Sequence, residues 1–232
     1  MLTAYLDENG HESQEHVFVA GHVGNDSQWK AFLEQWVPAR GNRKQIHLSA
    51  LRWSNPRTHK LLAALGPIPA RCNLTRAVGG VRVSDYADLL RGSHEQKALK
   101  GYYFALNGLV TQVTRWIPDD ERIEFVFEDQ RRYRDTASKL ISDFSKTLVN
   151  SHGKSKIANW SFVPKGSTVL LEQADYLANA LGHLYRDQNS DKSIWTKSIL
   201  GDMTGIGAIT KRKQIREVIK LGHLVRDSGA VL

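Results

Sequence analysis

Acidic side chains at three separated places are the residues of this 232-residue chain that can support metal-assisted chemistry. The places are Asp7 with Glu8, Glu128 with Asp129, and Asp175. The first two pairs close apolar alternating stretches, and the third stands beside the apolar stripe of a helical pattern. Ligands collect at strand ends in α/β folds. Carboxylate oxygens are the ligands that Mg²⁺ and Mn²⁺ prefer, so these acids indicate a magnesium or manganese site.

Each acidic place also has an interpretation without chemistry. Residues 7–10 form a good turn sequence, Asp-Glu-Asn-Gly. Glu128 and Asp129 precede Arg131 and Arg132, which is typical of a helix start with surface ion pairs. Asp175 can pair with a buried cation. Because the acids are far apart in sequence, spacing alone leaves both interpretations open.

The helical pattern around Asp175 separates it from its neighbour Glu172. A turn of about 100° per residue gathers the apolar residues of 170–181 on one side of the predicted helix. Asp175 lies at the border of this stripe, whereas Glu172 lies further toward solvent. A half-buried carboxylate costs free energy unless it is paired or bound to a metal. This pattern favours Asp175 as a ligand and Glu172 as a helper.

Apolar periodicity predicts the elements that must position these acids. Positions 2, 4 and 6 alternate in a strand over 2–7, and 17–24 forms a second strand of the same hairpin. The clearest strand is 122–128. The remaining predicted elements are strands over 70–78 and 157–163 and helices over 26–37, 56–65, 84–117 with a break near 92, 133–148, 169–185, 193–200 and 211–226. Helices between strands imply a mixed α/β sheet with parallel pairs, opened by an antiparallel hairpin.

Composition limits the class of protein and its partners. Apolar residues make up 41% of the chain, which excludes intrinsic disorder. The lone Cys72 excludes an intramolecular disulfide and a cysteine-built zinc site. A net charge of +8 is compatible with a polyanion such as nucleic acid. No stretch of 18 apolar residues occurs and the first residues are acidic, so we expect a cytoplasmic protein that does not contact membranes.

Five segments of the chain carry a resemblance to a known family. They are 5–10 (Tyr-Leu-Asp-Glu-Asn-Gly), 18–23 (Phe-Val-Ala-Gly-His-Val), 46–49 (Ile-His-Leu-Ser), 127–129 (Phe-Glu-Asp) and 173–178 (Gln-Ala-Asp-Tyr-Leu-Ala). Together they resemble the bacterial and phage family called domain-of-unknown-function family 3800, over most of 1–185. That family is similar to the ribonuclease-H-like superfamily of nucleases and transposases. Asn9 stands where the family usually has Ser.

The resemblance implies which acids form the site. Ribonuclease-H-like enzymes carry them on the first strand, at the end of the fourth strand and on the last core helix. Asp7, Glu128 and Asp175 correspond to these places. Glu128 is favoured over Asp129, because Asp129 would share the side of the apolar residues 123–127.

Other residues are candidate helpers or contacts to nucleic acid. The candidate helpers are Glu8, Asp129, Glu172 and His47; His47 follows the family pattern, and a structural role for it is the alternative. Basic residues that can contact a phosphate backbone are Arg131, Arg132, Lys211, Arg212, Lys213 and Arg216.

We therefore expect residues 1–205 to form a ribonuclease-H-like core of about five strands, with a helical insertion at about 80–118. Residues 206–232 are expected to form a basic C-terminal helix that docks on this domain or on a second copy in a homodimer. The leading hypothesis is a Mg²⁺- or Mn²⁺-dependent phosphodiester hydrolase acting on RNA or DNA. The alternative is a non-catalytic nucleic-acid-binding protein, associated for instance with ribosomes or mobile elements. A protein-interaction subunit is a third interpretation.

Overall fold

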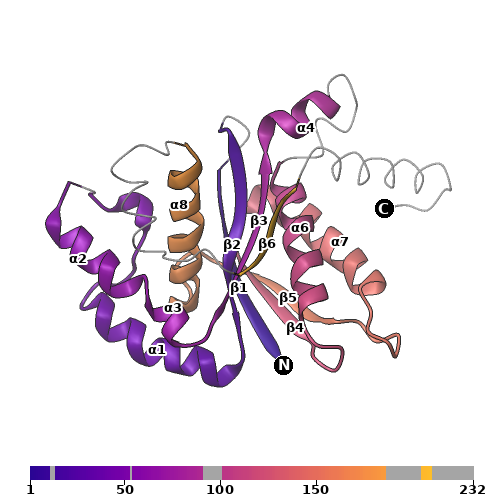
Figure 1. Cartoon of the computed structure of the whole chain (residues 1–232), viewed down its shortest axis with the longest axis horizontal. Coiled ribbons are helices and arrows are strands. Elements are labelled where there is room, and N and C mark those ends of the chain that lie inside the picture. The colour runs from indigo at the N-terminus through magenta and orange to yellow at the C-terminus, as the bar shows by residue number, and fades with distance from the viewer. Residues whose placement is uncertain (11–13, 53, 91–100, 187–204, 211–232) are drawn as a thin grey trace.

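A six-stranded mixed sheet with the strand order β5-β4-β1-β2-β3-β6 forms the centre of the fold (Figure 1). The computed structural model describes residues 1–10, 14–52, 54–90, 101–186 and 205–210. The strands are β1 (Leu2–Asn9), β2 (His16–Gly24), β3 (Thr75–Arg82), β4 (Ile123–Glu128), β5 (Ile157–Val163) and β6 (Ile206–Thr210). Strand β2 runs antiparallel to β1 and β3, whereas β4 and β5 run parallel to β1, and β6 parallel to β3. The predicted α/β class is confirmed, and the arrangement is consistent with a ribonuclease-H-like fold.

Local sequence signals explain where several helices begin. The helices are α1 (Asp26–Arg40), α2 (Pro56–Leu65), α3 (Ile68–Arg71), α4 (Val83–Leu90), α6 (Gly101–Trp116), α7 (Arg131–Thr147) and α8 (Glu172–Arg186), with short 3₁₀ turns η1 (Leu48–Ala50) and η2 (Val169–Leu171). Asn25 and Gln28 form a reciprocal capping box at the start of α1. Asn55 caps α2 ahead of Pro56, as the sequence predicts.

Helices cover both faces of the sheet, and strand alternation decides which side chains meet which helices. Figure 1 shows α1, α2, α3 and α8 on one side and α6 and α7 on the other. On β1, Ala4 and Leu6 belong to the core beneath α6 and α7. Tyr5 packs into the core beneath α1 and α8. Asp7 follows the alternation of Tyr5, so its carboxylate is directed to the α8 side.

Three boundaries differ from the sequence predictions. The third strand covers 75–82 instead of 70–78, because residues 68–71 form α3 with Pro69 in its first turn. Residues 206–210, predicted as part of the C-terminal helix, form the sixth strand by pairing with β3. Within the expected insertion 80–118, α6 packs on β2, β3 and β6 and therefore belongs to the core. The predicted helices over 193–200 and 211–226 lie outside the described residues.

No helix within the described ranges is both long enough and apolar enough to cross a membrane.

Candidate functional site

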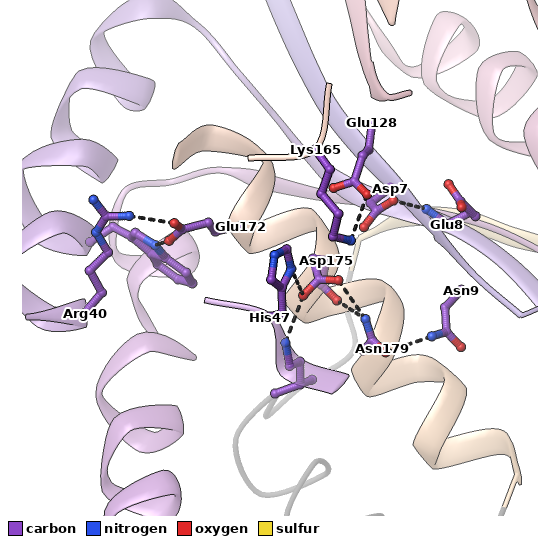
Figure 2. Close-up of polar contacts among 12 residues, drawn as sticks. Asp7, Glu8, Asn9, Arg40, His47, Glu128, Lys165, Glu172, Asp175 and Asn179 are labelled. Carbon is purple, nitrogen blue, oxygen red and sulfur yellow. Dashed lines mark hydrogen bonds and ion pairs between the residues drawn. The ribbon is translucent and has the colours of Figure 1, made fainter. Parts of the chain in front are cut away.

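Asp7 and Glu128 lie beside one another at the carboxyl edge of two parallel strands. In the register of β1 and β4, Leu6 is opposite Phe127, so Asp7 and Glu128 come next on the two strands. Both carboxylates are only 4% exposed. Figure 2 shows them close together, above the start of α8. Of the pair Glu128 and Asp129, Glu128 is the acid whose side chain lies beside Asp7 (Figure 2).

Asp175 approaches the same place from the first turn of α8. Its Oδ2 accepts a hydrogen bond from the backbone N–H of Leu48 at 2.9 Å, and its Oδ1 accepts one from Asn179 Nδ2 at 3.0 Å. His47 Nδ1 lies 3.9 Å from Asp175 Oδ2, too far for a hydrogen bond. That ring nitrogen is buried and has no hydrogen-bond partner. The η1 segment thus orients Asp175 and brings an unsatisfied imidazole nitrogen to the site.

Two side-chain hydrogen bonds hold α8 against β1, although these two elements are distant in sequence. Asn9 Nδ2 donates to Asn179 Oδ1 at 2.9 Å. Gly182, one turn further along α8, makes this approach feasible, because a Cβ there would collide with the Asn9 side chain. Gln173 donates to the carbonyls of Leu170 at 2.8 Å and Tyr5 at 3.3 Å. These contacts fix Asp175 relative to Asp7.

Gln173 also accepts a hydrogen bond from His22 of β2. The Nε2 group of Gln173 donates both of its hydrogen bonds, so the amide oxygen of Gln173 accepts the bond from His22. The Nδ1 atom of His22 therefore carries the proton. Burial lowers the pKa of His22 to about 4, and the hydrogen bond only partly opposes this shift. The imidazole is therefore neutral at pH 7, and its buried hydrogen bond to Gln173 links the sheet to α8.

Lys165 brings a cation into contact with the acidic side chains. It lies just after β5, in a turn closed by a hydrogen bond from Ser167 N to the carbonyl of Pro164. Gly166 adopts φ +78° at the third position of this turn, as a type II turn requires. The Nζ atom is 2.8 Å from Glu128 Oε1. Figure 2 shows the ammonium group between Glu128 and Asp175.

The acidic groups influence one another electrostatically. Burial is the largest cause that raises the pKa of Asp7 well above its usual value. The charge of Glu8 raises this pKa further, as do those of Glu128 and Asp175, while Lys165 opposes them. For Glu8 itself, burial raises the pKa to about 7. A single ammonium therefore leaves the negative charge of the site partly uncompensated.

Partial burial of Lys165 by itself would lower the pKa of its ammonium. The hydrogen bond to Glu128 and the charge of Glu128, followed by those of Asp7 and Asp175, outweigh this effect and raise the pKa. The ammonium is therefore charged at neutral pH and acts as counterion to all three carboxylates.

The donor chemistry of the site fits a hard divalent cation. Asp7, Glu128 and Asp175 offer carboxylate oxygens, which suit Mg²⁺ and Mn²⁺. Within the described ranges, no group of three His, Cys, Asp or Glu side chains already forms a metal-binding cluster. The ammonium of Lys165 occupies the neighbourhood of Glu128. Binding of a metal to all three acids thus requires Lys165 to move and the carboxylates to adjust.

The structure places Glu172 and Asp129 outside this cluster. Glu172 is 3% exposed, so the prediction that it points toward solvent is wrong. Helix α1 covers that side of α8, and Glu172 accepts hydrogen bonds from Trp36 Nε1 at 2.8 Å and Arg40 Nη1 at 2.6 Å. Asp129 forms an ion pair with Arg134. Both acids are therefore engaged in ion pairs rather than free to help at the site.

Arg131 and Arg132 are exposed at the start of α7, just beyond the end of β4. The guanidinium of Arg132 lies 4.5 Å from the centre of the Tyr133 ring and lowers the pKa of Glu8 slightly against its burial. The other predicted nucleic-acid contacts, Lys211, Arg212, Lys213 and Arg216, lie outside the described residues.

Sequence reasoning missed two residues that contact the acids. Asn179 is four residues after Asp175, so helical spacing places it on the same side of α8 and offered a usable signal. Lys165 follows β5, the parallel neighbour of β4, and the strand-end rule applied to β5 would have found it. Neither signal identifies the ion pair with Glu128, which depends on the tertiary fold.

Comparison of the chain with protein-family models gives no match, and comparison with curated proteins gives none either.

Proposed function

We propose that the protein is a metal-dependent phosphodiester hydrolase acting on nucleic acid, with Mg²⁺ or Mn²⁺ held by Asp7, Glu128 and Asp175. The observation that carries this proposal is the position of Asp7. Its carboxylate is buried beside Glu128, and burial raises the pKa of Asp7, followed by the charges of Glu8, Glu128 and Asp175. Strongly perturbed carboxylates at a strand edge favour a functional site over a structural one. The resemblance to family 3800 supports the same choice.

The division of roles follows from the contacts. The bound metal would supply an activated water and stabilise the leaving oxygen. Asp7 and Glu128 would hold it from the sheet, and Asp175 would hold it from α8, where Leu48 and Asn179 orient the Asp175 carboxylate. The exposed Arg131 and Arg132 can bind backbone phosphates next to this edge. We further propose a cytoplasmic setting, where such substrates are available.

The test is a comparison of Asp7→Asn with Asp120→Asn. Asn keeps the shape of Asp but loses the charge that binds a metal, whereas Asp120 is exposed and far from the site in the fold. Both purified variants and the unchanged protein are incubated with labelled single-stranded and duplex RNA and DNA, in Mn²⁺ and in EDTA. We expect Mn²⁺-dependent cleavage that Asp7→Asn abolishes and Asp120→Asn retains. Equal cleavage by all three proteins would contradict the proposal.

A second function, binding of nucleic acid without cleavage, is favoured by one specific observation. Lys165 already neutralises part of the acidic cluster without any metal. In a binding protein, replacing Asp7 would leave affinity for nucleic acid undiminished, and no substrate would be cleaved in any metal. Both functions predict binding that weakens steeply with salt, because phosphate contacts release counterions. Cleavage in Mn²⁺ therefore separates them, and salt dependence separates both from a protein-interaction subunit.

A further inference from the structure

The described residues place one chain-borne cation, Lys165, at the position where the proposed function requires a metal. Its Nζ is 2.8 Å from Glu128 Oε1, and its charge acts on Asp7 and Asp175 as well. The side chain of Glu128 is 3% exposed, so its carboxylate meets this ammonium where water is largely excluded. A divalent cation that binds Glu128 would meet the like charge of Lys165 a few ångströms away. Such repulsion is strong where water is largely excluded.

The Lys165 side chain is able to move away from Glu128. About half of it, 51%, is exposed, although its end contacts a buried carboxylate. The long flexible stem of lysine lets the ammonium swing into solvent while the turn fixed by Gly166 keeps the backbone in place. Strands β4 and β5 are parallel neighbours, so Lys165 leaves the same sheet edge as Arg131 and Arg132. A displaced ammonium would join these exposed guanidinium groups.

We infer that Lys165 competes with the divalent metal for Glu128, and that the displaced ammonium then binds a phosphate of the nucleic acid. This inference rests on the proposed function, since it assigns a role to Lys165 at the same site. It predicts two effects of opposite sign for one substitution. Removing the ammonium should strengthen metal binding, because the competitor is gone, and should weaken binding of nucleic acid, because a phosphate contact is lost. A purely structural ion pair predicts neither effect.

The experiment uses Lys165→Gln, the charge-retaining Lys165→Arg and the control Lys154→Gln. Lys154 is exposed and lies before the amino end of β5, so it matches the charge change at the opposite end of the same strand. Binding of Mn²⁺ alone is followed by the electron paramagnetic resonance signal of the free ion. Binding of a fluorescent phosphorothioate oligonucleotide, which resists hydrolysis, is followed by anisotropy with and without saturating Mn²⁺. Thermal melting checks that each variant is folded.

We expect Lys165→Gln to bind Mn²⁺ at least about tenfold more tightly than the unchanged protein, because the like charge beside the metal is removed. In saturating Mn²⁺, its oligonucleotide affinity should fall and its salt slope should flatten by about 0.7–0.9, the effect of one phosphate contact. Lys165→Arg and Lys154→Gln should stay close to the unchanged protein in Mn²⁺ affinity.

Mn²⁺ binding to the unchanged protein that Lys165→Gln does not tighten would overturn the inference and leave the proposed function standing. Tighter Mn²⁺ binding with no loss of oligonucleotide affinity would overturn the phosphate contact. Absence of Mn²⁺ binding in both proteins would overturn the inference and the proposed metal site together.

Discussion

Helix α8 carries two buried carboxylates three residues apart, and their surroundings differ sharply. Glu172 accepts hydrogen bonds from Trp36 and from the guanidinium of Arg40, so its charge is matched locally. Asp175 faces Asp7 across the sheet edge, and its hydrogen bonds from the described residues come from neutral donors, a backbone N–H and the Asn179 amide. Among the described residues, Lys165 brings an ammonium to that side, and its charge acts on three acids.

The difference separates a structural acid from a candidate functional one. A buried ion pair joins two elements, here α1 and α8, and losing either partner leaves an uncompensated charge. A buried acid that shares a cation with other acids stores repulsion, which an added divalent cation would relieve. Burial alone therefore does not identify a functional carboxylate; the balance of nearby charge does.

The largest expected effect comes from neutralising the two acids of α8 one at a time. Asp175→Asn should lower Mn²⁺-dependent cleavage by about a thousandfold or more, because a metal ligand loses its charge. Glu172→Gln should keep most activity, since its carboxylate contacts α1 and not the site. Cleavage rates of the two folded variants, measured side by side, test the comparison. Equal losses would mean that the two acids do not differ in role.

A smaller effect concerns stability at Glu172. Arg40→Met leaves this buried carboxylate with Trp36 as its hydrogen-bond donor and should cost about 3 kcal/mol of unfolding free energy. Lys30→Met, on an exposed position of the same helix, should cost less than about 0.5 kcal/mol. Urea denaturation measures both values. Adding Glu172→Leu to Arg40→Met should recover much of the loss; no recovery would show that Arg40 acts through packing alone.

The repulsion at the site should appear as a pH dependence on the order of 1 kcal/mol. Asp7 and Glu8 bind protons more readily in the folded chain than in the unfolded chain, because folding raises their pKa values. Stability should therefore fall as the pH rises through the interval from the ordinary value of Glu8, 4.5, to about 7. Unfolding in urea across this range checks the sign. Asp7→Asn should flatten the profile, and Asp120→Asn should leave it unchanged.

The smallest effect is expected at the basic rim. Replacing Arg131 and Arg132 together with Ser should flatten the salt dependence of oligonucleotide binding by up to about 1.4–1.8, for two phosphate contacts. Thermal stability should barely change, because exposed charges contribute little. Lys139→Ser with Lys154→Ser removes two exposed charges elsewhere and serves as the control. A slope unaffected by the arginine pair would remove these residues from the proposed interface.

Sequence patterns predicted the sheet best where the largest apolar side chains stand at every second position. Ile123, Phe125 and Phe127 alternate with less apolar residues, and this segment forms β4 within one residue of the expected bounds. The sequence of strand β6 has no such alternation. Gly205 and Gly207 flank a short stretch, and this pattern is typical of a hinge. Its conformation comes from pairing with β3, a contact that no local pattern contains.

The candidate site, like the sheet, could be predicted from the sequence only in part. Asp7 and Asp175 could be proposed from a strand end and a helical stripe, and Glu128 from the alternation of β4. The prediction for Glu172 was wrong because it assumed that α8 packs against its surroundings on one side alone. In the structure, both the sheet and α1 cover α8. The Lys165–Glu128 pair could not be predicted, since it depends on the register of β4 and β5 and on the turn that follows.

The placement of Asp7 on the first strand and Asp175 on α8 has a consequence for the order of events during synthesis. The ribosome makes the chain from the amino end, and domains generally fold as their residues emerge. A nascent chain can pair β1 with β2 and later with β4, yet it lacks the third carboxylate until α8 has been made and docked. The docking of α8 thus also completes the acidic cluster. A growing or truncated chain that ends before α8 carries β1 to β5 without β6 and without the assembled site.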